Sequence, residues 1–97
     1  MSGYIYVIKS LHLYKIGRSK YLNKRIKAYK LYNPFGIETI YSVRVKDHER
    51  VERLLHTKYK DKRVSGEWFE LKEEDLETLK QFLIPRMTSF LEKYEMV

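Results

Sequence analysis

Two short runs of β-branched and aromatic residues lie close together at the start of the chain. Residues 4–8 read Tyr-Ile-Tyr-Val-Ile, and residues 13–16 resume the same character after a short connection at 10–12. Such side chains favour strands, and so short a connection favours an antiparallel pair. The sequence therefore predicts a β-hairpin whose second strand ends at Gly17, and the rest of the chain must pack around it.

The next part of the chain predicts one helix and one further strand. Ser19 is expected to cap the helix, whose apolar positions recur at helical spacing: Leu22, Ile26 and Tyr29. Residues 33–36 (Asn-Pro-Phe-Gly) break the helix. Residues 37–45 alternate as a third strand does, with one face formed by Ile37, Thr39, Tyr41, Val43 and Val45.

Two more helical patterns follow. Asp47 is a good N-cap for a helix with the apolar stripe Val51, Leu54, Leu55 and Tyr59. A basic loop then leads to Gly66 and a short extended segment at 67–71. The last helix has acidic residues where its N-terminus favours them, Glu73, Glu74 and Asp75, and a buried stripe of Leu76, Leu79, Phe82 and Leu83. Pro85 predicts a kink or break, followed by a short helix through Leu91.

This order predicts an α/β fold of the α+β kind, with a small, mainly antiparallel three-stranded sheet flanked by helices. A chain of 97 residues has room for one domain, expected over 1–97. The absence of cysteine excludes disulfides and thiolate-bound zinc. The sequence shows neither an apolar run long enough for a membrane span nor a signal-peptide pattern, so we expect a soluble intracellular protein, cytoplasmic or nuclear, with no membrane partner.

Positive charge is concentrated in the first two thirds of the chain. Residues 1–63 hold 16 basic and 5 acidic side chains, whereas residues 64–97 hold 4 basic and 8 acidic ones. Between Lys15 and Lys30 there are seven basic residues and no acid. A field this polarised concentrates a polyanion at one face. It favours nucleic acid as the partner over a basic surface kept only for solubility.

Short motifs on the predicted hairpin and helices match one nuclease family in order and spacing. Tyr4-Ile5-Tyr6 is followed on the next strand by Lys15-Ile16-Gly17, and then by Arg25, Tyr29 and Glu52 on the two helices. In this set the chain resembles the GIY-YIG nuclease superfamily over about residues 3–71, with a helical segment at 73–95 following that core. The stretch 64–69 (Val-Ser-Gly-Glu-Trp-Phe) resembles a subgroup found in phage and other viral proteins, and the KIG form of the second motif fits family restriction enzymes.

The resemblance implies a DNA endonuclease that depends on Mg²⁺ or Mn²⁺ and leaves 5′-phosphate and 3′-hydroxyl ends. Tyr6 is implied as the general base, with Tyr4 on the same side of its strand, and Glu52 as the metal ligand. Arg25 suits the phosphate as a bidentate donor, and Lys15 adds charge there or lowers the pKa of the tyrosine. Further nucleic-acid contacts are expected from Arg18, Lys20, Lys24, Tyr29 and His56.

Alternatives remain open at the sequence level. Lys15 stands where tyrosine is commonest in the family, and no asparagine follows Asn33, so a nucleic-acid-binding module of the same fold with weak or no catalysis is the second hypothesis. A protein-interaction domain that uses the acidic last helix is the third. Glu52 is either a metal ligand or an ordinary salt-bridging residue, and His48 is expected in solvent. DNA is favoured over RNA, and either a monomer or a homodimer is expected.

Overall fold

The computed structural model describes residues 2–33 and 35–87. Its elements in chain order are β1 (Gly3–Ser10), β2 (Leu13–Ser19), α1 (Leu22–Tyr32), β3 (Glu38–Val45), α2 (His48–Lys58), the 3₁₀ turn η1 (Lys60–Lys62), β4 (Arg63–Ser65), β5 (Trp68–Phe69), α3 (Glu73–Leu83) and the 3₁₀ turn η2 (Ile84–Arg86). All strand pairs are antiparallel, in the order β3-β1-β2-β5-β4. The predicted α+β class is therefore confirmed.

The sheet of the described residues has five strands rather than the three predicted. The extended segment expected at 67–71 contributes β5, which pairs with the start of β2, and β4 pairs with β5 in turn. Gly66 lies between these two strands with a φ of 55°, a conformation that glycine adopts without strain and that suits a tight reversal. The added strands are 3 and 2 residues long, too short for an alternating pattern to reveal them.

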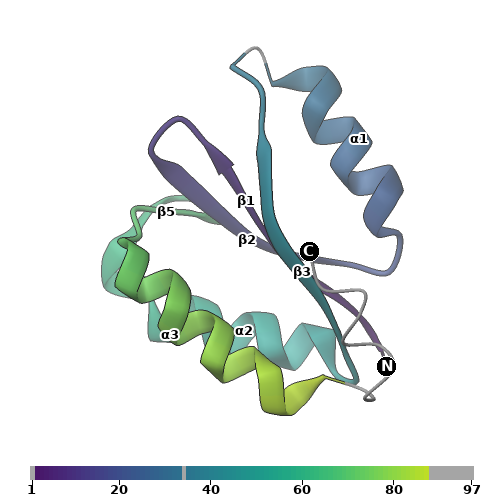
Figure 1. Ribbon diagram of the computed structural model, residues 1–97, viewed down its shortest axis with the longest axis vertical. Helices are drawn as coiled ribbons and strands as arrows, with labels where there is room; N and C mark the ends of the chain where they lie inside the picture. The colour runs from purple at the N-terminus through teal and green to yellow at the C-terminus, as the bar shows by residue number, and fades with distance from the viewer. Residues whose placement is uncertain (1, 34, 88–97) are drawn as a thin grey trace.

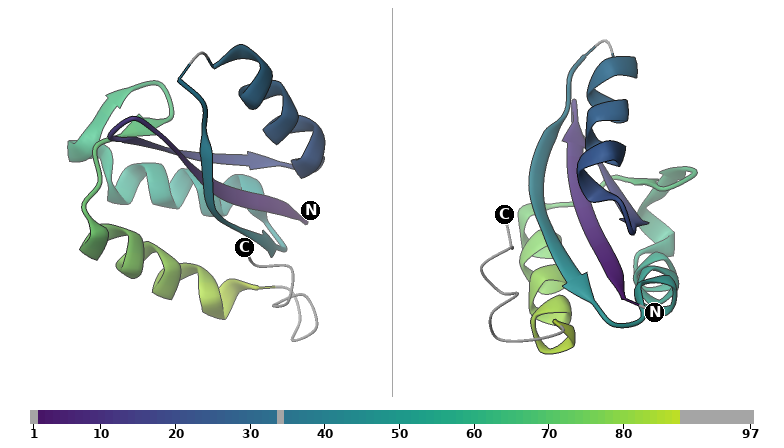
Figure 2. Two further views of the ribbon diagram at one scale, coloured as in Figure 1. Left: turned by 45° about the horizontal axis from the view of Figure 1, so that its top comes forward. Right: turned by 90° about the vertical axis from the view of Figure 1, so that its right-hand side faces the viewer.

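The helices cover both sides of the sheet. α2 and α3 lie side by side against one face, and α1 lies on the opposite side (Figures 1 and 2). The hydrophobic core forms on the α2 and α3 side and joins β1, β2, β3 and both helices through residues such as Ile5, Val7, Val43, Leu55 and Leu79. In contrast, α1 contributes no buried residue. Its apolar positions Leu22, Ile26 and Tyr29 are half-buried, so α1 packs on the sheet through one partly covered face.

β1 lies between β3 and β2 in the sheet and is covered on both faces, which explains its continuous apolar run. Residues 5–8 are all fully buried, because Ile5 and Val7 face the core while Tyr6 and Ile8 face the α1 side. β2 pairs with one edge of β1 and β3 with the other. The run predicted at 4–8 is thus a strand covered on both faces.

Most helix signals act as predicted, with three differences. The Asp47 side chain accepts a hydrogen bond from the Arg50 N–H at 3.3 Å and caps α2. Ser19 does not cap α1, because its hydroxyl accepts the Tyr21 N–H at 2.9 Å and Tyr21 occupies the N-cap position. Leu54 is partly exposed, so it leaves the predicted stripe. His48, expected in solvent, is buried and packs against Gly3, where a β-carbon would approach the ring to 2.6 Å.

The C-terminal expectations are met as far as the structure describes them. α3 ends at Leu83, and Pro85 lies in the 3₁₀ turn that follows, as a break at this proline requires. The short helix predicted through Leu91 lies outside the described residues. No helix within residues 2–33 and 35–87 has the length and apolar character that crossing a membrane requires.

Candidate functional site

Gly17 makes room for the ring of Tyr6. The two residues are partners across β1 and β2, and a β-carbon on Gly17 would lie 2.4 Å from both Cζ and Oη of Tyr6. Gly17 does not end its strand as predicted, because β2 continues to Ser19. The glycine therefore serves close approach rather than a turn: the end of the Tyr6 ring takes the space that a side chain at position 17 would need, and Tyr6 is fully buried.

The Tyr6 hydroxyl meets a second hydroxyl from α1. Its oxygen lies 2.9 Å from that of Tyr29, and the two ring centroids are 6.0 Å apart. One helical turn earlier, Arg25 also interacts with the Tyr29 hydroxyl, and this hydrogen bond raises the pKa of Arg25. α1 thus brings a guanidinium and a phenol to the buried end of Tyr6.

Burial raises the pKa of Tyr6 well above its usual value, and the hydrogen bond and charge of Tyr29 act in the same direction. The carboxylate of Glu67 raises it further, whereas Arg25 lowers it. Tyr6 is therefore a neutral hydrogen-bonding phenol in the free protein near neutral pH.

Lys15 points into the same region from β2. Its side chain is only 12% exposed, and its ammonium lies 3.0 Å from Oε1 of Glu67. The ammonium is also 5.2 Å from the ring centre of Tyr29 and 5.5 Å from that of Trp68, within the range of cation–π attraction. The Lys15 side chain is therefore directed at Tyr29 and Glu67 rather than exposed at the edge of the sheet.

Glu52, Arg18 and His56 form a second group beside the edge of β2. The Glu52 side chain is 13% exposed, and its Oε1 accepts a hydrogen bond from Nε of Arg18 at 3.3 Å. His56 lies one turn along α2, with Nε2 2.8 Å from the carbonyl oxygen of Ile16 and its ring 5.1 Å from that of Phe69. His56 thus fastens α2 to the strand just before Gly17.

The carboxylate of Glu67 acts on both the Tyr6 group and the Glu52 group. It raises the pKa of Tyr6 and is paired with Lys15 on one side. On the other side, burial raises the pKa of Glu52 and the Glu67 charge adds to this, while His56 and Arg18 lower it. The two carboxylates are therefore close enough to repel one another, an arrangement that positive charge would relieve.

This donor set fits a hard divalent cation better than zinc. Within residues 2–33 and 35–87, no three His, Asp or Glu side chains are grouped closely enough to hold a metal ion by themselves. Mg²⁺ is commonly bound through one or two carboxylates and otherwise keeps its waters. Oε2 of Glu52 is buried and has no hydrogen-bond partner among the described residues, so it has lone pairs to offer. Glu52, with Glu67 nearby, is the pair that would hold such an ion.

A cleft of about 410 Å³ opens beside Glu52, and most of its charged lining is basic. Arg18, Arg53, Lys60 and Arg63 line it together with Glu49, Glu52, His56 and Thr57. Arg53, Lys60 and Arg63 were not singled out from the sequence. The spacing of seven between Arg53 and Lys60 was the available signal, although it crosses the end of α2 and so was not a continuous helical pattern.

The remaining predicted site residues lie on the Tyr6 side of the sheet. Tyr4 follows Tyr6 at strand spacing on the same side of β1 and, with Lys20 and Lys24, lines a hollow at the start of α1. The structure therefore places Tyr6, Lys15, Arg25 and Tyr29 together, with Glu52 in the neighbouring group.

Comparison with known families identifies the domain. A family model described as the T5orf172 domain matches residues 3–84, which include every element from β1 to α3. The chain belongs to the T5orf172 domain family. T5orf172 domains are related to the GIY-YIG and homing-endonuclease-like nucleases, so membership indicates a nuclease-related or nucleic-acid-related function. No curated protein and no solved structure matches this T5orf172 domain significantly.

Proposed function

We propose that this T5orf172 domain is a divalent-metal-dependent endonuclease that hydrolyses phosphodiester bonds in DNA. The observation that carries the proposal is the hydroxyl pair of the buried Tyr6 and the half-buried Tyr29 beside Arg25, with the two oxygens 2.9 Å apart and the Tyr6 ring against Gly17. A hydroxyl pair beside a guanidinium is suited to a phosphate and an attacking water, because it can hold and move a proton while the cation stabilises developing negative charge.

In this mechanism the residues divide the work by charge. Arg25 donates to the phosphate oxygens as a bidentate cation, and Lys15 adds positive charge after exchanging Glu67 for the phosphate. Tyr6 gives up its proton to solvent, directly or through the Tyr29 hydroxyl as that hydroxyl releases its own proton, and then takes the proton of the attacking water that it orients. The bond from phosphorus to the 3′-oxygen breaks, and this leaving oxygen takes a proton from solvent. Glu52, with Glu67, would hold Mg²⁺ or Mn²⁺, which when bound neutralises phosphate charge and lowers the pKa of nearby acids.

Two observations favour a second candidate, a binding module without turnover. The pKa of Tyr6 is raised, not lowered, by its surroundings, and the Lys15 ammonium is engaged by Glu67. A protein that only binds DNA would keep these residues as packing and would require no metal. Its affinity would fall with salt, as phosphate contacts require.

Nicking of supercoiled plasmid in Mg²⁺ or Mn²⁺ separates the candidates. Tyr6→Phe and Glu52→Gln should each lower the rate by about 100-fold or more, as loss of a proton-transfer group or metal ligand does. Tyr32→Phe and Glu74→Gln are matched controls that should leave it unchanged, since Tyr32 is 80% exposed at the end of α1 and Glu74 is exposed on α3. Equal rates in all four variants would contradict the assignment. A wild type that binds DNA in gel shifts but cleaves with neither ion would establish the binding module.

A further inference from the structure

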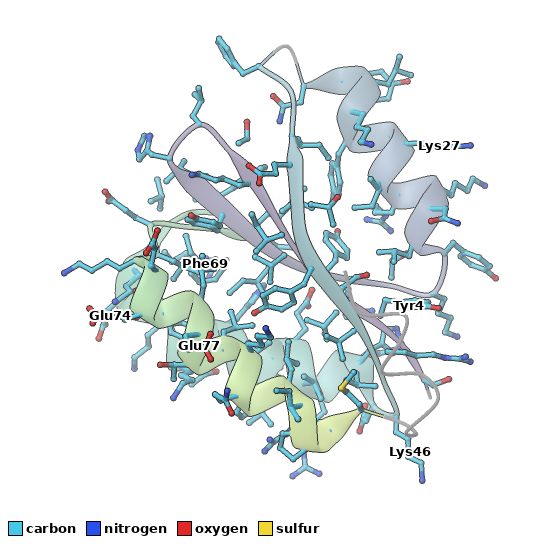
Figure 3. All side chains as sticks on the ribbon, in the orientation of Figure 1. Tyr4, Lys27, Lys46, Phe69, Glu74 and Glu77 are labelled. Atoms are coloured by element: carbon cyan, nitrogen blue, oxygen red, sulfur yellow. The ribbon has the colours of Figure 1, made fainter. Side chains whose placement is uncertain are left out.

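The hollow at the start of α1 is separate from the cleft beside Glu52. It has a volume of about 400 Å³ and is lined by Tyr4, Lys20, Tyr21, Leu22, Asn23 and Lys24; we call it the α1 hollow. Figure 3 shows the Tyr4 side chain beside the segment that leads into α1. Since Tyr4 and Tyr6 are two residues apart on the same side of β1, the hollow lies about 7 Å along the strand from the candidate site.

Tyr21 has no structural task that requires a ring. Its side chain is 72% exposed and makes no cap hydrogen bond at the N-cap of α1, a position that favours Ser, Thr, Asp or Asn. Among the described residues its hydrogen bonds come from the backbone: the N–H donates to the Ser19 hydroxyl and the carbonyl oxygen accepts from the Arg25 N–H at 3.0 Å. An exposed aromatic ring beside a hollow is therefore available for a ligand.

Charge identifies the class of ligand. Lys20 and Lys24 line the hollow on either side of Tyr21, and α1 and the segment before it carry no acidic residue between Lys15 and Lys30. Aromatic rings alternating with cations along a groove suit nucleic-acid strands, because bases stack on rings and phosphates pair with lysine. A base inside a duplex has both faces covered by its neighbours, so only an unpaired base can offer a face to Tyr21.

We propose that the α1 hollow binds an unpaired nucleobase, stacked on Tyr21, with Lys20 and Lys24 on the adjoining phosphates. The inference rests on the nucleic-acid role of the proposed function and adds a substrate class: strands with an unpaired nucleotide next to the cleavage position, as in single strands, flaps or frayed ends. Duplex DNA would engage the lysines but not the ring.

The test is fluorescence anisotropy with a labelled mixed-sequence oligonucleotide, single-stranded or annealed to its complement, in EDTA so that nothing is cleaved. Tyr21→Ala should weaken binding of the single strand at least about fivefold and of the duplex less than about twofold. Tyr21→Phe should restore the single-strand affinity, because the ring is what stacks. Tyr32→Ala, at an exposed tyrosine at the other end of α1, is the matched control and should change neither affinity.

Lys24→Gln should weaken both probes and lower the salt dependence of log K by about 0.7 on the single strand. The inference is overturned if Tyr21→Ala leaves single-strand affinity unchanged, weakens both probes equally, or is matched by Tyr32→Ala. The two tests fail independently. If Tyr21→Ala has no selective effect on the single strand but the protein nicks plasmid, only the base contact is refuted. If Tyr21→Ala has the expected effect but the protein does not nick plasmid, only the nuclease is refuted.

Discussion

Substitution of Gly17 by alanine tests the geometry of the candidate site most directly. The new β-carbon would lie 2.4 Å from Cζ and Oη and 2.8 Å from Cε1 of Tyr6. The ring is rigid and fully buried, so it cannot move aside as the end of an exposed flexible chain would. Relief of the clash therefore requires displacement of the ring or the strand, and ring displacement breaks the 2.9 Å contact with Tyr29.

The expected loss of stability is about 2 kcal/mol. Overpacking of a buried site costs about 1–3 kcal/mol, and loss of one hydrogen bond about 1 kcal/mol. Alanine recovers about 0.4–1 kcal/mol, because it restricts the unfolded chain and Gly17 has no positive φ that would strain it. A loss of this size lowers the Tm of a domain of this length by about 10 °C.

A double-mutant cycle in urea, followed by circular dichroism and by fluorescence of Trp68, isolates the cause. Trp68 is the only tryptophan in the chain. Tyr6→Leu removes all three clashing atoms, so Gly17→Ala should cost nothing, or stabilise slightly, in that background. If Gly17→Ala costs as much in the Tyr6→Leu background as in the wild type, the glycine is required by its own backbone and the reasoning fails.

Three further outcomes follow from single features. Leu11→Asn should stabilise the domain by about 1 kcal/mol in urea unfolding, because Leu11 is 63% exposed in the hairpin turn with a φ of 56°, and asparagine tolerates this conformation better. Glu52→Gln should raise the free energy of unfolding at neutral pH. The pKa of Glu52 is raised in the folded protein, so the stability that its uncharged carboxyl gives is fully present below the unfolded pKa of about 4.3 and is lost as the pH rises and the carboxyl ionises. Glutamine stays uncharged at every pH, so the stabilities of the two proteins should converge in acid. Arg53→Gln and Lys60→Gln should each lower the salt dependence of log K for duplex DNA by about 0.9, whereas Lys80→Gln on α3 should not.

Local signals in the sequence account for most of the fold. The run at 4–8, the Asp47 cap and the acidic start of α3 each act over a few residues, and all three appear in the structure. The extended segment at 67–71 was predicted but not its place in the sheet, and β4 escaped prediction, because a strand of two or three residues is defined by its partner: the start of β2 for β5, and β5 for β4. His48 escaped it for a similar reason, since only the distant Gly3 leaves space for its ring.

In the candidate site, too, residues in local motifs were predicted, whereas roles that depend on contacts between distant segments were not. Tyr6, Lys15, Arg25 and Tyr29 could be named from the resemblance of their motifs to the GIY-YIG family, and a strand, a hairpin and one helix bring them together. The central place of Glu67 could not, since it results from the pairing of β5 with β2 and from the approach of α2 on the other side. The role of Gly17 required the position of the Tyr6 ring itself.

The destabilising burial of the Glu52 carboxylate helps to decide between the nuclease and the binding module. Glu52 is largely buried, its Oε2 has no partner among the described residues, and its pKa is raised by burial and by Glu67. A carboxylate in this position destabilises the fold and repels a phosphate. Binding alone would be served better by an uncharged residue there, because the basic cleft of Arg18, Arg53, Lys60 and Arg63 already supplies the attraction. A largely buried acid set among cations that suit a phosphate is useful where a divalent ion must bind between the acid and the phosphate, so Glu52 favours the proposed nuclease over the binding module.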